Sequence, residues 1–441
     1  MLRNGRLFGH RVETGFPDLP ILEVSLRTCV RVRDMENLKR KQVMSQKEKY
    51  KRAAKGDIAY NMMRMWQGAV GPAPVDGLVS PAYVVVKPYD EANSSYYSYL
   101  FRTSAYMQEV NKFSRGIVAD RNRLYWESFK QMPSLVPPRP EQDQIVAYLR
   151  AQDAHIARFI KAKRELIKRL TEQKLRIIDH AVTRGLDSSV ALKPSGIEWL
   201  GEMPEHWDAS RLKYCVSRIH AGGTPDTGVD GYWSDSSDGI PWLLIADVTR
   251  ADRVANSTKR LTQAGLESKR LAVVPAGAVL YTMYASIGKA AILGIDSAIN
   301  QAILGLEPKS NLLEAEFLFF WLRSLERHIK NLASTSTQAN LNAAKVKALP
   351  MFLPPLEEQK LICAWIKSEC RIFDDAIART EEEIKLIREY RDRLIADVVT
   401  GQVDVQGWQP SPDDVVAEED LAALAGDEEI ETEGEDNDGE E

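Results

Sequence analysis

Long apolar runs are missing from this sequence, and no stretch of 18 apolar residues occurs in its 441 positions. The opening segment, MLRNGRLFGHRVETG, also lacks the apolar core of a signal peptide. The four cysteines are scattered through the chain rather than grouped as in a disulfide framework. We therefore expect no membrane span and no disulfide-stabilised secreted fold, and we expect a protein of the reducing cytoplasm.

Motifs for catalysis, phosphate binding and metal binding are also scarce. The segment SIGKAA at 286–291 contains Gly-Lys but lacks both the upstream glycine and the following Ser or Thr of a P-loop. The glycines of GGTPDTG at 222–228 are not followed by a helical pattern. The six histidines are scattered, and none has a partner at metal-ligand spacing. The sequence thus predicts a non-catalytic binding protein without cofactor or metal, because no nucleophile–base arrangement is visible either.

Basic residues are absent from the end of the chain. Residues 413–441 carry 15 Asp or Glu and no Lys or Arg. Without this segment the net charge changes from −5 to +10, with 58 basic against 48 acidic residues. The basic body favours a polyanionic partner such as nucleic acid, although charge alone leaves this open. The acidic end predicts a disordered tail.

A duplication organises the rest of the sequence. Aligned without a gap at an offset of 217, residues 137–187 and 354–404 are identical at 16 of 51 positions. Both copies open on Pro-Pro-x-x-Glu-Gln, as PPRPEQ and PPLEEQ. A prolyl pair cannot lie inside a helix, and Glu in a first turn favours a helix start. Each copy therefore begins a helix, with Glu141 and Gln142 or Glu358 and Gln359 in its first turn.

Both copies predict long helices that pair with each other. Apolar residues recur at spacings of three and four through each copy, which is typical of a coiled-coil seam. Residues 146–184 hold ten basic and four acidic residues, whereas residues 357–400 hold eight and eleven. This opposite balance favours antiparallel pairing within the chain over two unrelated solvated faces. Such a pair would act as a molecular ruler between two globular parts.

The globular parts repeat more weakly. KGDIAYNMM at 55–63 matches AGAVLYTMY at 276–284, with Tyr60 and Tyr281 in register. VSPAYVVVKP at 79–88 matches INQAILGLEP at 299–308, with Ala82 and Ala302 in register. Each part shows short strands followed by a helix, which predicts α+β domains.

The expected organisation has five parts. Residues 1–137 and 188–354 form the globular domains, 138–187 and 355–404 the two long antiparallel coiled-coil helices, and 405–441 the disordered acidic tail.

This order of parts resembles the specificity subunits of type I restriction–modification systems. The two Pro-Pro-x-x-Glu-Gln helices carry most of the resemblance. Further matches are NMMRMWQGAVG and GLVSPAYVVVKP in the first half, and GEMPEHWDASRLKYC, GGTP, IPWLLIADV, SAINQAI and STSTQANLN in the second. The resemblance covers residues 1–405, and the acidic tail lies outside it. The first domain lacks counterparts of GGTP and PEHW, so we expect a different domain subtype or missing N-terminal residues.

The resemblance implies a division of labour. Each globular domain would be a target-recognition domain reading one half of a split double-stranded DNA target. The helices would set the spacer and dock two modification (methyltransferase) subunits, and restriction subunits could join the complex. S-adenosylmethionine, ATP and Mg²⁺ would bind those partners and not this chain. The absence of the adenine-methyltransferase motif Asn/Asp-Pro-Pro-Tyr/Phe agrees with this expectation.

Candidate base-reading residues are polar residues of loop segments. Arg reads guanine, Asn and Gln read adenine, and apolar groups contact the thymine methyl. In the first domain the candidates are Asn61, Arg64, Trp66, Gln67, Arg115, Arg121, Asn122 and Arg123. In the second domain they are Thr224, Thr282, Tyr284, Ser286, Asn300, Gln301, Thr337, Gln338 and Asn340. For Trp66 a core position is the competing interpretation, and for Asn300 and Gln301 it is a role at strand ends. A coiled-coil scaffold whose globular ends bind proteins is the alternative function.

Overall fold

The computed structural model describes all residues except 27–28, 34–46, 117–121, 198, 285, 327, 330–340, 415–416, 418–420 and 425–441. The chain divides into two compact units. Unit 1 comprises Met1–Leu166 together with Arg379–Glu441, and unit 2 comprises the intervening Ile167–Ala378. In the part of the chain that is described, no helix is long and apolar enough to cross a membrane.

The sheet of unit 1 has four antiparallel strands in the order β2-β9-β6-β7. The central strands β6 and β9 are almost continuously apolar and buried, as expected for strands covered on both faces. Three short antiparallel pairs accompany the sheet, namely β1 with β10, β3 with β4, and β5 with β8. The strand bounds are β1 Leu2–Arg3, β2 Phe8–Arg11, β3 Leu22–Ser25, β4 Cys29–Val32, β5 Lys51–Ala53, β6 Ile58–Asn61, β7 Val70–Pro72, β8 Gly77–Val79, β9 Tyr83–Pro88 and β10 Pro133–Ser134.

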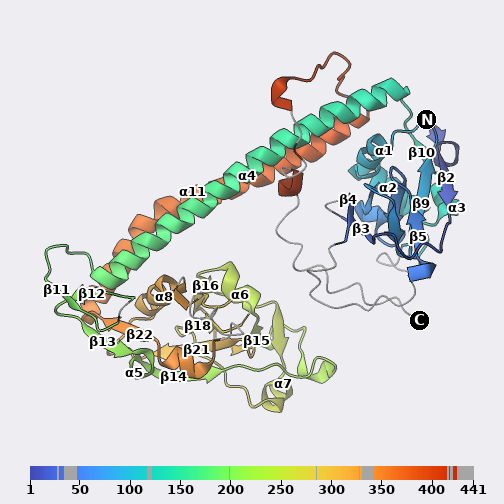
Figure 1. The fold of residues 1–441 in the computed structure, drawn as a ribbon. Coiled ribbons are helices and arrows are strands. Elements are labelled where there is room, and N and C mark those ends of the chain that lie inside the picture. The colour runs from blue at the N-terminus through green and yellow to red at the C-terminus, as the bar shows by residue number, and fades with distance from the viewer. Residues whose placement is uncertain are drawn as a thin grey trace. The chain divides into compact units, whose positions relative to one another are not determined.

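Helices α1 (Ser94–Phe101), α2 (Ser104–Phe113) and α3 (Trp126–Phe129) complete the globular part of unit 1 (Figure 1). α1 and α2 begin at side-chain caps, because Asn93 and Thr103 accept hydrogen bonds from first-turn amides. Aromatic rings from the sheet and the helices form the core, with centroids 4.7–6.0 Å apart. Short 3-10 turns lie at η1 Asn4–Arg6, η2 Lys47–Lys49 and η3 Met65–Gln67.

Unit 2 contains a five-stranded sheet in the order β14-β21-β18-β19-β16 and a three-stranded sheet in the order β17-β15-β20. β13 pairs with β22, and β11 pairs with β12. The strands are β11 Leu192–Pro194, β12 Glu202–Pro204, β13 Asp208–Arg211, β14 Val216–Ala221, β15 Ile240–Leu243, β16 Arg253–Val254, β17 Lys259–Leu261, β18 Val279–Thr282, β19 Ala290–Leu293, β20 Ala298–Ile299, β21 Ile303–Pro308 and β22 Pro350–Leu353. The shorter helices are α5 Leu212–Cys215, η5 Asp230–Tyr232, α6 Ile245–Arg250, α7 Gln263–Ser268, α8 Ala315–Ser324 and α10 Ala343–Lys347.

Two long helices follow the two globular parts. α4 spans Arg139–Arg184 with 46 residues, and α11 spans Leu356–Val399 with 44. The portions that share a unit run side by side (Figure 1). In unit 1, Arg391 contacts Asp153 at 2.6 Å and Lys163 contacts Glu383 at 2.5 Å, so the two portions are antiparallel. In unit 2, the Lys174 ammonium lies 2.6 Å from the Asp374 carboxylate. The predicted α+β class with long, paired helices is confirmed.

Most of the predicted disordered tail falls outside the described residues, but its first part is ordered. Val405 is buried, and the Trp408 ring packs edge-on against Tyr148 of α4 with centroids 5.6 Å apart. Gln144 of α4 donates to the carbonyl of Trp408 at 2.7 Å, and His155 lies 2.7 Å from Asp414. Residues 405–414, including η6 (Pro412–Asp414), therefore dock on α4, which the acidic composition alone did not predict. A last 3-10 turn, η7, spans Ala422–Leu424.

Candidate nucleic-acid interface

The end of a central strand is built in the same way in both units. In unit 1, Met62 follows β6, and its carbonyl oxygen accepts a hydrogen bond from the Leu124 amide at 2.9 Å. In unit 2, Met283 follows β18, and its carbonyl oxygen accepts from the Leu341 amide at 3.2 Å. The amides of the two methionines donate to the two alanines that the sequences place in register, Ala82 and Ala302. In each domain, a later part of the chain thus attaches at the end of the same central strand.

Predicted base-reading residues immediately precede these two leucines. In the first domain they are Arg121, Asn122 and Arg123, and in the second they are Thr337, Gln338 and Asn340. Arg121 and the three residues of the second domain lie outside the described part of the chain. The shared attachment at Leu124 and Leu341 makes the two segments topological equivalents.

A tight turn at 61–68 follows β6 in unit 1. Asn61 is 7% exposed, and its side-chain oxygen accepts the Met63 amide at 2.9 Å. The Trp66 indole donates to the Met63 carbonyl at 2.9 Å and packs against the core. Asn61 and Trp66 therefore shape the turn, and their role as base readers stays a prediction. Arg64 is half-buried in the same turn, and Gln67 is exposed beside it.

Arg115 and Arg123 lie in the segment after α2, which returns to this turn. Arg115 and Arg123 exchange both backbone hydrogen bonds at 3.0 Å, and both residues are exposed. Asn122 directly precedes Arg123, and its side-chain nitrogen lies 3.4 Å from the side-chain oxygen of Asn111. Because Leu124 is bonded to Met62, the two exposed arginines belong to the same end of the domain as Gln67.

In unit 2, three of the predicted residues are accessible around the equivalent strand end. The Thr224 hydroxyl donates to the side-chain oxygen of Gln301. Tyr284 follows Met283 and is 37% exposed, and Ser286 is half-buried two residues later. The structure thus brings Thr224, Tyr284 and Gln301 to one end of the domain, since Met283 is bonded to the residue after Gln301.

Two other predicted residues of unit 2 point inward. Thr282 is 0% exposed; its hydroxyl donates to the Ser286 carbonyl and accepts the Lys289 amide at 3.0 Å. Asn300 is 7% exposed, and its side-chain oxygen accepts the Ala302 amide at 3.0 Å. Both side chains hold the backbone of their turns. That they also read DNA stays a prediction.

Two tryptophans that are not among the predicted residues hold the GGTP loop and the residue that follows it. The Trp242 indole donates to the Gly223 carbonyl at 3.0 Å, and the Trp233 indole donates to the Asp226 carbonyl at 3.1 Å. Their rings meet edge-on with centroids 5.1 Å apart. A Cβ atom on Gly222 would lie 2.0 Å from the Asn300 carbonyl oxygen, so only glycine allows this close approach. The signal for this arrangement in the sequence is that Trp233 and Trp242, which can donate from their indoles, follow soon after Gly222 and Gly223.

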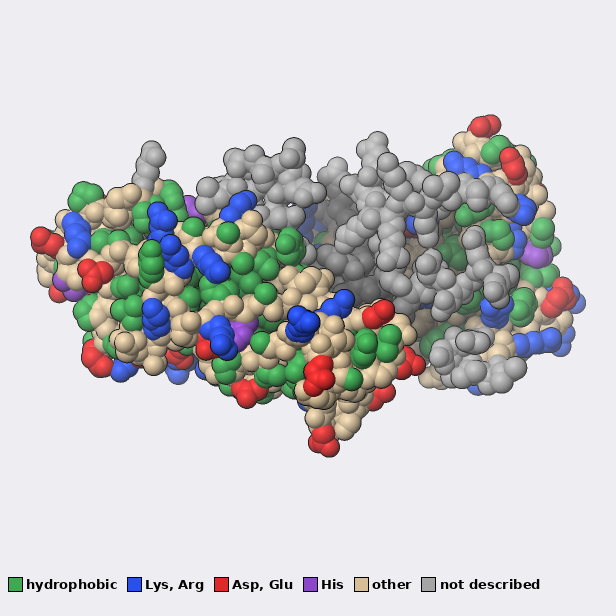
Figure 2. All heavy atoms as spheres, turned by 90° about the horizontal axis from the view of Figure 1, so that it is seen from below, with side chains coloured by type: hydrophobic (Ala, Val, Ile, Leu, Met, Phe, Trp, Pro, Cys, Tyr) green, Lys and Arg blue, Asp and Glu red, His purple; other side chains and the backbone are tan. Residues whose placement is uncertain are grey.

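The charge of the accessible surface suits a phosphate backbone. In the view of Figure 2, Lys and Arg side chains are spread across the middle of the visible face of unit 2. Lys and Arg bind phosphates, which position a protein on DNA, whereas base edges carry the sequence information. The accessible polar residues named above could supply the second kind of contact.

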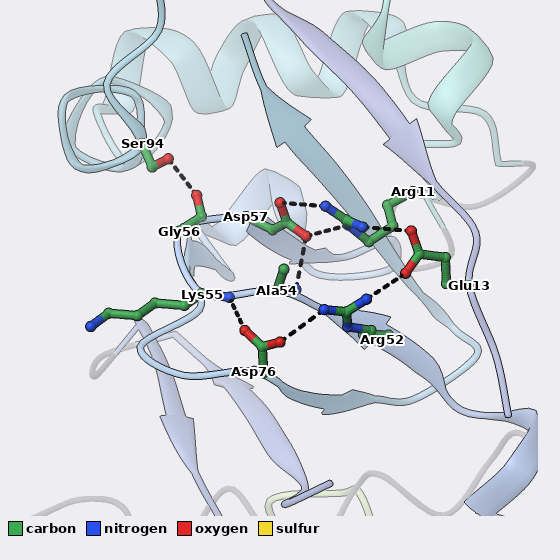
Figure 3. Close-up of polar contacts among 9 residues, drawn as sticks. All are labelled: Arg11, Glu13, Arg52, Ala54, Lys55, Gly56, Asp57, Asp76 and Ser94. Atoms are coloured by element: carbon green, nitrogen blue, oxygen red, sulfur yellow. Dashed lines mark hydrogen bonds and ion pairs between the residues drawn. The ribbon is translucent and has the colours of Figure 1, made fainter. Parts of the chain in front are cut away.

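The acidic cluster of unit 1 is a structural network rather than a catalytic one. Asp57, Arg11, Glu13, Arg52 and Asp76 form an alternating chain (Figure 3). The guanidinium of Arg11 lies 2.6 Å from Asp57, and that of Arg52 lies 2.9 Å from Asp76. Burial raises the pKa of Asp57, against the effect of its hydrogen bonds. Because each carboxylate contacts an arginine, Asp57 and Asp76 do not form an acid–base pair, and the network instead joins β2, β5 and β6.

The described residues were also compared with the requirements of a metal site and of a reactive thiol. Among them, no group of three or more His, Cys, Asp or Glu side chains could hold a metal ion. All four cysteines are free thiols, and burial raises the pKa of Cys363 to about 12. Such a thiol is the opposite of an activated nucleophile.

Comparison with known proteins finds similarity to components of restriction–modification systems. Residues 205–386 match the family described as Type I restriction modification DNA specificity domain. The chain is 24% identical over 192 residues to the type I restriction enzyme MjaIX specificity subunit of Methanocaldococcus jannaschii, covering 43% of this chain and 42% of that protein. It is 23% identical over 332 residues to the putative MjaX specificity subunit of the same organism, covering 75% and 71%. The alignment thus spans less than half the length of the first relative and most of the second.

A solved structure shares the fold. A chain from the study titled "Structural basis underlying complex assembly and conformational transition of the type I R-M system" superposes with a TM-score of 0.57. The superposition covers 91% of this chain and 97% of that chain at 16% sequence identity. At this identity the likeness shows the fold alone.

Proposed function

We propose that this chain is the DNA-recognition subunit of a type I restriction–modification complex, as its similarity to specificity subunits of such systems suggests. Each globular domain reads one half of a bipartite, asymmetric DNA target. The observation that carries this proposal is the shared framework at Met62 and Met283, to which Leu124 and Leu341, the residues that follow two different polar stretches of sequence, are bonded. A duplicated scaffold with unlike loops suits two unlike half-sites.

The parts of the chain take the following roles in this proposal. Residues 1–137 and 188–354 are the recognition domains, 138–187 and 355–404 are the spacer helices, and 405–441 is the acidic tail. The chain carries no chemistry of its own; the methyltransferase partners supply it together with S-adenosylmethionine, and restriction subunits would supply ATP-dependent steps. Four free thiols suit the reducing cytoplasm in which we place this activity.

Base readout is assigned to the accessible residues at the framework end of each domain. In the first domain these are Arg64, Gln67, Arg115, Asn122 and Arg123, with Arg121 outside the described residues. In the second domain they are Thr224, Tyr284, Ser286 and Gln301, with Thr337, Gln338 and Asn340 outside the described residues. Guanidinium and amide groups are the side chains that make bidentate contacts with guanine and adenine.

The assignment to two half-sites is tested by changing one domain at a time. The full chain, assembled with its methyltransferase partner, selects sequences from a duplex library. Arg123→Ala should relax base preference in one half-site only, and Gln301→Ala in the other half-site only, by about 1–3 kcal/mol where the residue makes a bidentate contact. Arg6→Ala and Gln263→Ala are matched controls, because Arg6 and Gln263 are exposed residues of the same types in the same units and are not among the predicted readers. A change in both half-sites from either substitution would refute the assignment.

The spacer role of the helices is tested by lengthening both of them. Seven residues inserted after Lys168 in α4 and seven after Ala378 in α11 keep the apolar seam in phase, because seven residues are close to two helical turns. The helices would lengthen by ~10 Å, which corresponds to roughly three base pairs of B-DNA. We expect the preferred spacer to grow by that amount. An unchanged spacer would contradict the ruler.

Docking of the methyltransferase is assigned to the outer side of the helices. In unit 1, Leu386 and Tyr390 of α11 are 53% and 52% exposed and lie four residues apart, so they share a helix face. Exposed apolar side chains on one face are typical of a protein interface. This face suits an apolar surface of the methyltransferase.

The scaffold alternative makes a different prediction about salt. A DNA-binding complex loses affinity for mixed duplex DNA as salt rises, because phosphate contacts release counterions. We expect a steep decrease for the assembled complex. Affinity that does not change with salt would favour the scaffold whose ends bind proteins.

A further inference from the structure

The glutamine of the first Pro-Pro-x-x-Glu-Gln motif is a buried joint between helix and domain. Gln142 is 0% exposed. Its side-chain oxygen accepts the Asn93 amide at 2.8 Å, and its side-chain nitrogen donates to the carbonyls of Glu91 and Pro137, each at 2.9 Å. Asn93 is the N-cap of α1, whose rings lie in the core of the domain. One side chain thus ties the start of α4 to the loop and cap of a core helix.

The glutamine of the second motif makes the same three hydrogen bonds. Gln359 is 0% exposed, and its side-chain oxygen accepts the Glu314 amide at 2.9 Å. Its side-chain nitrogen donates to the carbonyls of Leu312 at 2.9 Å and Pro354 at 2.8 Å. Glu314 is the N-cap of α8, as Asn93 is of α1. Both N–H donors and the oxygen are used in each glutamine, so neither amide tolerates a rotation of the helix start.

Packing at the two joints differs although the bonds agree. In unit 1, Arg139 and Asp143 add contacts to the joint, since Arg139 donates to the Asp90 carbonyl and Asp143 accepts from Asn93. In unit 2, Glu358 accepts instead from the Trp207 indole and contacts His206. The glutamine bonds are therefore the part that two otherwise different joints share.

We propose that Gln142 and Gln359 are positioning residues that fix the direction of each spacer helix against its recognition domain and thereby set the spacing of the two half-sites. This inference rests on the proposed function. Because α4 is long, a small change of angle at its first turn causes a large displacement at its far end. At ~1.5 Å per residue, a tilt of about 5° moves a point 46 residues away by ~6 Å, close to two base pairs. Helix length alone cannot define a spacer unless the joint is stiff.

The test uses the full chain assembled with its methyltransferase partner. The DNA library holds the two half-sites of the wild-type target, separated by spacers of varying length. Gln142→Met and Gln359→Met keep the shape of the side chain and remove all three hydrogen bonds. We expect the base preference within each half-site to be kept. The ratio of affinities between the best spacer and its neighbours should fall about fivefold per joint, the equivalent of one net hydrogen bond.

Gln144→Met is the matched control, because Gln144 lies on the same helix and donates to the carbonyls of Val405 and Trp408 rather than to the domain. Its spacer preference should equal that of the wild type. Folded joint variants that keep the wild-type spacer ratio, or a control that loses it equally, would overturn the inference. If a Met variant does not fold, Gln142→Glu and Gln359→Glu keep the acceptor oxygen and are read in the same way. Failure of the wild type to select two half-sites would instead refute the proposed function.

Discussion

A buried ion pair in the helix seam of unit 1 gives the sharpest stability prediction. The Arg391 guanidinium makes a bidentate contact with Asp153, at 2.6 Å and 3.1 Å, and Tyr99 donates to the same carboxylate at 2.8 Å. The side chains of Asp153 and Arg391 are 9% and 25% exposed. Burial and the Asp153 carboxylate raise the pKa of Tyr99 well above its ordinary value, so its hydroxyl stays protonated and donates. The contact joins α4, α11 and α1.

The magnitude follows from what each substitution leaves behind. Removing one partner of a buried pair costs about 3–5 kcal/mol, because the other charge stays buried without compensation. Since Arg391 keeps partial access to water, we expect a loss of ~2–3 kcal/mol for Asp153→Val and for Arg391→Met. The double variant removes both charges and leaves the Tyr99 hydroxyl without its acceptor, which costs ~1 kcal/mol. Asp392 also loses a contact with Arg391, at 3.7 Å, but its side chain is 79% exposed and stays solvated. The coupling energy should therefore exceed ~2 kcal/mol.

Hydrogen exchange of the α4 and α11 amides in unit 1 measures these losses without assuming that the whole chain unfolds in one step. The reasoning predicts that the double variant is more stable than either single variant. A double variant as unstable as the sum of the two single variants would refute it. At the equivalent positions of the other copies stand Cys370 and Lys174, and Lys174 contacts Asp374 instead, at 2.6 Å.

Three further predictions concern the surface and the loops. Leu386→Lys should weaken assembly with the methyltransferase without changing the melting temperature. Lys163→Ala on the neighbouring helix is the control, and it should change assembly and stability by no more than a surface ion pair contributes, ~0.5 kcal/mol. If Leu386→Lys assembles as well as the wild type in a titration, Leu386 is not part of the interface. Thr282→Val should cost about 1–2 kcal/mol in chemical unfolding, because the Lys289 amide loses its acceptor, and a neutral result would show that this turn relaxes. Docking of residues 405–414 should weaken in acid. The Ser411 amide and His155 lower the pKa of Asp414. The contribution of Asp414 to docking is therefore complete above the ordinary pKa of Asp and is lost as the pH falls through the lowered pKa. Protection of these amides that stays constant into strong acid would contradict this.

The helices and their pairing were predictable because their signals are periodic. Apolar spacing, the Pro-Pro start and the opposite charge balance all survive in a single sequence, and Lys163–Glu383 and Lys174–Asp374 are pairs of the expected kind. The role of Gln142 was not predictable, since a glutamine in a first helical turn is usually a solvated residue. Only the fold shows that a loop and a cap close over it.

The readers within each loop could not be separated from the residues that support the loop. Asn61, Thr282 and Asn300 were chosen because their side chains can bind bases, but the same groups bind nearby backbone in turns. At the tail, the composition predicts disorder where the structure shows packing contacts. Val405 and Trp408 provide apolar contacts that an acidic average conceals, so residues 405–414 dock on α4 although the segment as a whole reads as disordered.

Backbone hydrogen bonds explain how one scaffold can carry two different readers. The contacts of Met62 with Leu124 and of Met283 with Leu341 involve only main-chain atoms, which nearly every residue supplies. Loop side chains on such a frame can change without loss of the attachment, as the difference between RNR at 121–123 and QAN at 338–340 illustrates. The joints, by contrast, have one side chain in common, and there both copies keep glutamine. A protein that reads two unlike half-sites at one fixed spacing needs this combination of free loops and fixed joints.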